Sequence, residues 1–163
     1  MWSLILYGVM LLFLAYSIKD VKELGIKPLN AWDTLLALVV LWIMICLSFF
    51  ISLIFYGMGF SEDVTKVKET IENVPLLTLL PLSIIGSIVE EMFFRGYIQR
   101  KTNLFMASFL FAYFHIIYGS FAEIVVAFVL GCLLGYSYQI SKNLSVPILS
   151  HILFNLCMIL LLV

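Results

Sequence analysis

Two adjacent glutamates and an arginine stand at the end of an apolar stretch, in the segment SIVEEMFFRGY over residues 87–97. Glu91 and Arg95 are four residues apart with the acid first, which on a helix favours an ion pair on one face. Glu90 points about 100° away from Glu91 and has no basic residue at helical spacing. A carboxylate that no cation neutralises in apolar surroundings binds a proton readily, as a general base near neutral pH must. We therefore predict that Glu90 is a base and that the Glu91–Arg95 pair is its scaffold.

The two histidines of the chain also lie within apolar segments. His115 ends the run FLFAYFH, and His151 lies in VPILSHILFN with Asn155 one helical turn later on the same face. A single histidine in such a segment often serves only to hold two helices together. Two histidines with an amide and an unpaired glutamate indicate a polar site, because ionisable groups within a membrane usually face the bundle interior or a cavity.

The composition identifies the surroundings of these residues. Of 163 residues, 64% are hydrophobic and 12% are charged, and the mean hydropathy is +1.15, far above that of a soluble domain. We expect an all-α integral membrane protein, since helices satisfy their own backbone polar groups in lipid. The net charge of −1 and the pI of about 6.1 argue against nucleic acid as a partner. The three cysteines form no CxxC pair and predict neither disulfides nor zinc binding through cysteine.

Six apolar runs of near-spanning length predict one transmembrane domain, residues 1–163, of about six helices joined by short loops. Their approximate limits are residues 1–18, 32–60, 74–98, 103–118, 121–140 and 145–163. Ala15-Tyr16-Ser17 loosely resembles a signal-peptide cleavage site, but no basic residue precedes this run, so we expect the first helix to be retained. The second loop, SEDVTKVKETIEN, has apolar residues at helical spacing and predicts a short interfacial helix.

The basic residues predict the orientation. Seven of the nine fall in the first, third and fifth loops or beside them, namely Lys19, Lys22, Lys27, Arg95, Arg100, Lys101 and Lys142. By the positive-inside rule the odd-numbered loops are cytoplasmic. We count depth from the presumed cytoplasmic end of each predicted helix, at about 1.5 Å per residue. Glu90, His115, His151 and Asn155 then lie roughly 10 to 21 Å deep in the membrane. They can share one layer, and we expect a polar chamber that opens to the cytoplasm.

Other features have structural explanations. Ser120 and Glu123 form an S-x-x-E capping box at the start of the fifth predicted helix, which explains Glu123 without chemistry. Gly131 and Gly135 form a G-x-x-x-G face that lets another helix approach closely, and we expect that helix to belong to the same bundle.

The spacings together resemble those of a known family. The motifs in chain order, each on a separate predicted helix, are Glu90-Glu91-x-x-x-Arg95, Phe111-x-x-x-His115 and His151-x-x-x-Asn155. They resemble the signatures of the CPBP (CAAX protease and bacteriocin-processing) intramembrane proteases, which include type II CAAX prenyl endopeptidases and bacteriocin self-immunity proteins. The resemblance covers about residues 75–160, the expected catalytic core, and every motif position is filled. The chain is shorter than many members, which carry more helices.

The residues supply what amide hydrolysis needs, and the resemblance implies the same glutamate-dependent mechanism. We expect Glu90 to activate a water with His115 as its partner, and His151 with Asn155 to stabilise the oxyanion. In a second scheme Glu90, His115 and His151 hold a divalent metal such as zinc. We favour the scheme without metal or other cofactor, because there is no H-E-x-x-H motif and each ligand would come from a different helix.

The predicted function is that of an intramembrane endopeptidase acting on a membrane-associated peptide or protein. By resemblance, prenylated CAAX peptides are one substrate class, and peptide leaders, pheromones or toxins are others. An alternative is a non-catalytic bacteriocin-immunity or scaffold protein of the same fold, which would have the same composition. A small proton-coupled transporter would also place acids and histidines within the membrane, but there is no evident inverted repeat.

Overall fold

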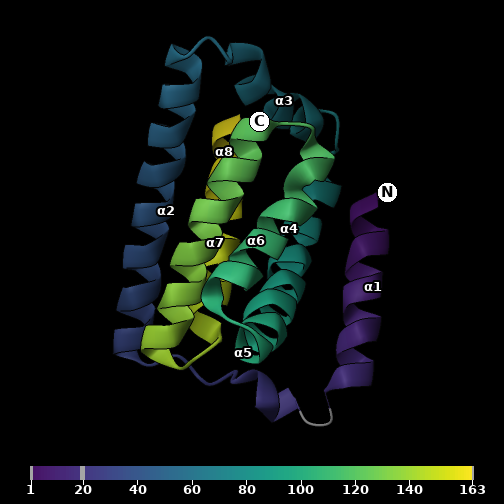
Figure 1. Cartoon of the computed structure of the whole chain (residues 1–163), viewed down its shortest axis with the longest axis vertical. Helices are drawn as coiled ribbons and strands as arrows, with labels where there is room; N and C mark the ends of the chain where they lie inside the picture. Colours follow the sequence, from purple (N-terminus) through teal and green to yellow (C-terminus); the bar gives the residue numbers. More distant parts are fainter. Residues whose placement is uncertain (1, 19–20, 163) are drawn as a thin grey trace.

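The computed structural model describes residues 2–18 and 21–162 and confirms an all-α polytopic membrane protein. Figure 1 shows α1, α2, α4, α6, α7 and α8 standing roughly side by side and α3 (Ser61–Glu72) across the upper end of the bundle. The bounds of the six are Trp2–Ser17 (α1), Ala31–Gly57 (α2), Leu76–Glu91 (α4), Leu104–Phe114 (α6), Phe121–Ser141 (α7) and Ser145–Leu162 (α8). Short elements join them, namely the 3₁₀ helices Val21–Leu24 (η1) and His115–Tyr118 (η3), the π-helix Met92–Ile98 (η2) and Gln99–Lys101 (α5).

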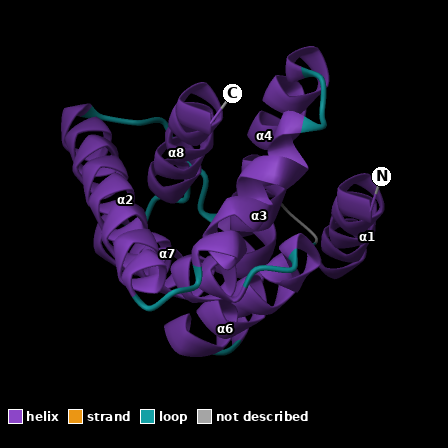
Figure 2. Cartoon of the chain, turned by 90° about the horizontal axis from the view of Figure 1, so that it is seen from above, coloured by secondary structure: helices purple, strands orange, loops and turns teal. Residues whose placement is uncertain are grey.

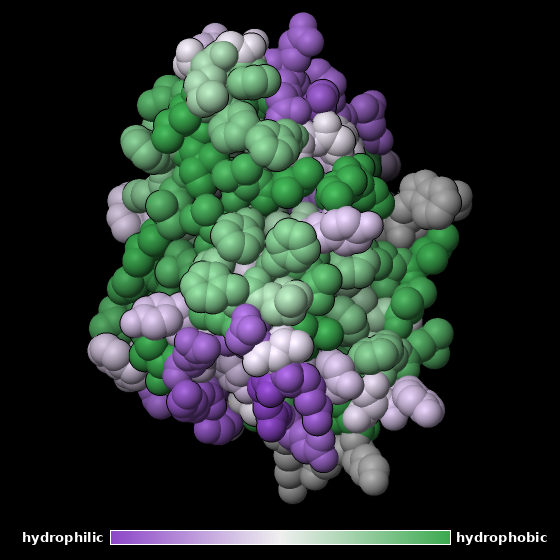
Figure 3. Space-filling model, in the orientation of Figure 1, coloured by the Kyte–Doolittle hydropathy of each residue, from purple (hydrophilic) through white to green (hydrophobic). Residues whose placement is uncertain are grey.

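Length and hydropathy separate the helices into two groups. Ala31–Gly57, Leu76–Lys101 and Phe121–Ser141 are long and apolar enough to cross a membrane, and Leu4–Ser17, Leu104–Tyr118 and Ser145–Leu161 are shorter apolar helices. These helices match the six predicted runs apart from small shifts at their ends. Figure 3 shows a hydrophobic surface over the middle of the bundle, with hydrophilic residues gathered at its lower end and at its upper right. This pattern fits a bundle surrounded by lipid.

The glycine face of α7 packs against neighbours in the same chain, as predicted. A Cβ added to Gly131 would lie 3.2 Å from the Phe111 ring and 3.3 Å from Ser108 Cβ, both on α6. A Cβ added to Gly135 would lie 2.6 Å from Gln99 Oε1. The same two glycines offer their carbonyls to Arg95 and Gln99, so the close approach also provides buried hydrogen bonds.

The predicted interfacial helix is α3, Ser61–Glu72. Figure 2, seen from above, shows α3 near the middle of the molecule, with α2, α4, α6 and α8 around it. Its anchor is Asp63, whose carboxylate accepts hydrogen bonds from the Ala122 N–H at 2.8 Å, the Ser120 hydroxyl at 3.1 Å and the Phe121 N–H at 3.2 Å. Burial has the largest single effect and raises the pKa of Asp63, but these hydrogen bonds and one from Lys66 together outweigh it and hold the pKa below its ordinary value.

This anchor corrects the predicted role of Glu123. The Ser120 hydroxyl does accept from the Glu123 N–H at 3.1 Å, which is half of a capping box. Within the described part of the chain, however, the Glu123 carboxylate makes no return bond to the Ser120 N–H. The carboxylate that caps this helix belongs to Asp63 of α3 instead. Capping therefore does not explain the Glu123 side chain.

Candidate active site

The Glu91–Arg95 ion pair is present and lies entirely inside the bundle. Arg95 Nη1 is 2.9 Å from Glu91 Oε1, and both side chains have no exposed surface. Arg95 Nη2 donates to the Gly131 carbonyl of α7 at 3.1 Å, and the guanidinium carbon lies 4.4 Å from the centre of the Phe111 ring. The helix that carries the pair changes from α to π at Met92, a widening that often occurs at functional sites. The ion pair therefore joins the third predicted span to α6 and α7.

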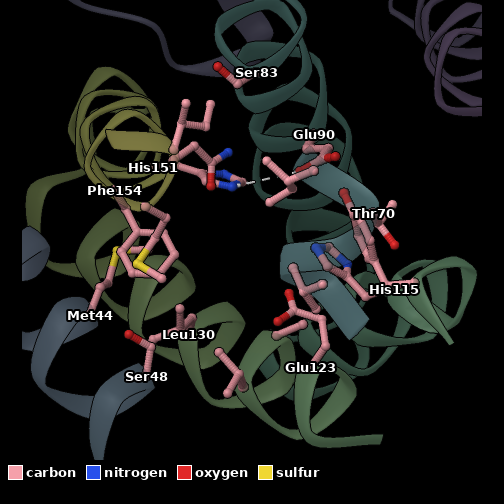
Figure 4. A pocket seen from close by; sticks show the side chains of 18 of the residues that line it. Met44, Ser48, Thr70, Ser83, Glu90, His115, Glu123, Leu130, His151 and Phe154 are labelled. Carbon is pink, nitrogen blue, oxygen red and sulfur yellow. Dashed lines mark ion pairs between the residues drawn. The ribbon is translucent and has the colours of Figure 1, made fainter. Parts of the chain in front are cut away.

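His151 reaches the same carboxylate from α8. Its Nδ1 lies 2.9 Å from Glu91 Oε1, and because a carboxylate only accepts, the histidine nitrogen is the donor. Its Nε2 lies 3.8 Å from Glu90 Oε2, and Figure 4 shows His151 directed across the cavity toward Glu90. With the Nδ1 proton used, Nε2 accepts a hydrogen bond when the ring is neutral and donates one when the ring is protonated. The structure thus brings Glu90, Glu91 and His151 together from two helices.

His115 is the first residue of η3, where α6 ends. Its Nδ1 lies 2.8 Å from the Phe111 carbonyl oxygen, which accepts a hydrogen bond and cannot donate one. In the neutral ring the proton is therefore on Nδ1, and Nε2 is a hydrogen-bond acceptor. Because His115 also lines the cavity that contains Glu90, it is placed where an acceptor could orient a water.

Asn155 lies one turn after His151 on α8 and also lines the cavity. Its Nδ2 donates to the Ser87 hydroxyl at 3.0 Å, and that hydroxyl donates to the Ser83 carbonyl at 2.8 Å. Sequence reasoning missed Ser87. The available signal was its position four residues before Glu91, which places both residues on the same face of α4. Ser87 orients the amide of Asn155 and leaves its second N–H available.

A further contributor that sequence reasoning missed is Tyr7 of α1. A Cβ added to Gly86, one turn before Glu90, would lie only 2.5 Å from the Tyr7 hydroxyl oxygen. Tyr7 and Glu90 line the same cavity. The glycine in an otherwise apolar helix was the available signal for a close approach at this point. The first helix therefore forms part of the site's wall.

A cavity of about 260 Å³ connects these residues. Glu90, His115, His151 and Asn155 all line it, and most of its remaining wall is apolar and comes from α2, α4, α7 and α8. Another part of the wall is formed by Val67, Thr70 and Ile71 of α3 and by Val74. Among the described residues that line it there is no lysine or arginine. The ionisable side chains that line this cavity are thus carboxylates, histidines and tyrosines.

The placement of the donor atoms bears on the predicted metal alternative. Among residues 2–18 and 21–162, no group of three or more His, Cys, Asp or Glu side chains is arranged to hold a metal ion. The Nδ1 atoms of both histidines already bond to Phe111 and Glu91. These bonds leave Nε2 of each histidine available, as in many metal-ligating histidines, so independence of metal stays a prediction and no catalytic step is assigned to a metal.

The fold and site define a helical membrane protein with a buried polar cluster facing an internal cavity. The family described as "Type II CAAX prenyl endopeptidase Rce1-like" matches residues 72–157, more than half of the chain. The chain belongs to this family, as the resemblance predicted, and the matched region contains all three motifs.

Two Bacillus subtilis (strain 168) proteins are similar to the chain. "Putative membrane peptidase YdiL" is 26% identical over 172 residues, which cover 95% of this chain and 68% of that protein. "Uncharacterized protein YpbD" is 29% identical over 149 residues, which cover 88% of this chain and 76% of that protein. No solved structure matches the chain significantly.

Proposed function

We propose that the chain is an intramembrane endopeptidase in which Glu90 activates the attacking water. The observation that carries the proposal is the convergence of Glu90, His115, His151 and Asn155, from three separate segments, on one cavity. Membership of the Rce1-like family and the name of the relative "Putative membrane peptidase YdiL" also support it.

In the proposed mechanism a water is held between the Glu90 carboxylate and His115 Nε2. Glu90 takes a proton from this water as its oxygen attacks the carbonyl carbon of the scissile amide. His151 Nε2–H and the Asn155 amide donate to the developing oxyanion. When the tetrahedral intermediate collapses, the C–N bond breaks and Glu90 returns the proton to the leaving nitrogen.

Glu91 has a specific role in this scheme. His151 already donates its Nδ1 proton to Glu91, so it can donate from Nε2 only as the imidazolium. The Glu91 carboxylate accepts the Nδ1 proton at 2.9 Å and so fixes the direction of the ring, and Arg95 holds Glu91 in place. Glu91 and Arg95 thus position His151 and do not touch the reacting atoms.

The proposed substrate is a membrane-associated peptide or protein, and the family suggests a prenylated one. Apolar walls around a polar centre suit a lipid-modified peptide that approaches within the bilayer. The first experiment is cleavage of internally quenched peptides, with and without a farnesyl group, by purified protein in detergent. Glu90→Gln should abolish cleavage, whereas Glu69→Gln, the same change on the exposed face of α3, should not. Equal cleavage by the parent and Glu90→Gln would refute the assignment.

The side from which the substrate enters needs its own test. The charge distribution predicts that the odd-numbered loops and the opening of the site are cytoplasmic. Lys19, one of the basic residues behind this prediction, lies outside the described residues. The cavity wall also includes residues of α3, which belongs to the second loop and therefore to the opposite side in this orientation. Single cysteines in the three odd loops should be shielded from an impermeant thiol reagent added to intact cells, and Glu69→Cys on α3 should be labelled. The reverse pattern would invert the orientation.

A further inference from the structure

Glu123 is a second carboxylate in the cavity that the proposed mechanism does not use. It lies in the first turn of α7 and lines the cavity together with Glu90. Figure 4 shows its carboxylate directed into the space between His115 and Leu130. The explanation from the sequence, a capping box, does not account for this side chain because Asp63 caps the helix.

No described lysine or arginine pairs with the Glu123 carboxylate, and the nearby Lys66 is bonded to Asp63 and to the Gly119 carbonyl. Within the described part of the chain its carboxylate makes no hydrogen bond and no ion pair, and no described lysine or arginine lines the cavity. Its neighbours along the cavity face of α7 are the apolar Val126, Ala127 and Leu130. An ionisable group inside a membrane-spanning helix without a partner indicates a functional contact with something outside the chain.

We propose that Glu123 binds an ammonium group of the substrate while the scissile bond lies against Glu90 and His115. The inference rests on the proposed function for the identity of the ligand as a peptide. Glu123 lies in the first turn of α7, where the positive end of the helix dipole favours a negative charge, and the ammonium group supplies the missing partner when a substrate binds. The ammonium group comes from a lysine side chain or from a free peptide amino terminus.

The expected selectivity is large enough to measure. A hydrogen bond between charged groups in this largely apolar cavity should favour a lysine ligand over its norleucine counterpart by about ten- to a hundredfold. The norleucine side chain keeps the four-carbon chain of lysine and lacks only its ammonium group. The comparison therefore isolates the charge from the apolar contacts.

The first test measures binding without catalysis, in the Glu90→Gln background, by titration calorimetry in detergent. The probes are N-octanoyl-lysine amide and N-octanoyl-norleucine amide for the side-chain source. Norleucine octylamide and its N-acetyl derivative serve for the amino-terminal source. We expect one ammonium probe to bind at least ten times more tightly than its neutral partner. The preference should disappear in Glu90→Gln/Glu123→Gln and persist in Glu90→Gln/Glu123→Asp.

Charge reversal guards against a variant that merely fails to fold. Glu90→Gln/Glu123→Lys should prefer N-octanoyl-glutamate amide over the lysine probe. Equal affinity of charged and neutral probes, or a preference that survives Glu123→Gln, overturns the inference. Peptide cleavage by the parent separates this result from the proposed function: ammonium preference without any cleavage leaves the binding site established and refutes the peptidase. Cleavage with no ammonium preference supports the peptidase and refutes the ammonium site at Glu123.

Discussion

Replacing Glu91 by glutamine, alone and together with Arg95→Met, should separate the stability of the bundle from its catalysis. Glu91 Oε1 accepts from Arg95 Nη1 and from His151 Nδ1, each at 2.9 Å, and the acid and the arginine are both completely buried. Glutamine keeps the shape and one acceptor oxygen but removes the negative charge. Breaking a buried ion pair by neutralising one partner typically destabilises a protein by about 3–5 kcal/mol, because the other charge stays buried without compensation.

The contacts left to Arg95 place the expected loss near the lower end of this range. After the change, Arg95 keeps its hydrogen bond to the Gly131 carbonyl and its contact with the Phe111 ring. The original pair is also incompletely satisfied, since Glu91 Oε2 and Arg95 Nε have no hydrogen-bond partner among the described residues. We therefore expect Glu91→Gln to lower the free energy of unfolding by about 3 kcal/mol.

The double variant Glu91→Gln/Arg95→Met gives the decisive comparison. It removes the uncompensated charge, so stability should return to near that of the parent. Activity should not return, because the hydrogen bond to a charged carboxylate that positions His151 is lost. The loss of that oxyanion donor corresponds to about a hundred- to a thousandfold in kcat.

Stability can be measured by equilibrium unfolding in mixed micelles of dodecylmaltoside and dodecyl sulfate, and activity by peptide cleavage. The single variant Arg95→Met completes the thermodynamic cycle. A change below about 1 kcal/mol in Glu91→Gln would contradict the buried-pair argument. A double variant with full activity would refute the role of Glu91 in positioning His151.

Three further predictions follow from other contacts. Ser87→Ala should lower kcat by part of the about hundredfold loss expected for Asn155→Ala, because it releases the amide; unchanged kcat would show that the orientation has no effect. Asp63→Asn should lower thermal stability at pH 7. The pKa of Asp63 is depressed, so its contribution in the parent is present above the unfolded pKa of about 3.9 and disappears as the pH falls through the lower folded value. The difference between parent and variant should vanish in strong acid, and a difference independent of pH would contradict this. Finally, protein stripped by a strong chelator should keep most of its activity in metal-free reagents, whereas loss restored by stoichiometric zinc would revive a ligand role for His115.

Local patterns in the sequence determined the fold class and one contact of the site. Hydropathy identified the apolar helices, because a lipid-facing segment must be apolar along its whole length. The spacing of four residues predicted the Glu91–Arg95 pair, because one helical turn brings such residues together whatever surrounds the helix.

Only the tertiary structure decided which helices share these groups. His151 is 60 residues from Glu91, and Asn155 is 68 residues from Ser87, so no local spacing encodes either hydrogen bond. The same reason explains the incorrect capping prediction. The S-x-x-E pattern is local, and it correctly predicted the hydrogen bond from the Glu123 N–H to the Ser120 hydroxyl. It could not predict that Asp63, 59 residues before Ala122, caps the same helix once α3 packs there. That packing leaves the Glu123 carboxylate in the cavity, where its neighbours come from separate helices and the sequence order alone does not place them.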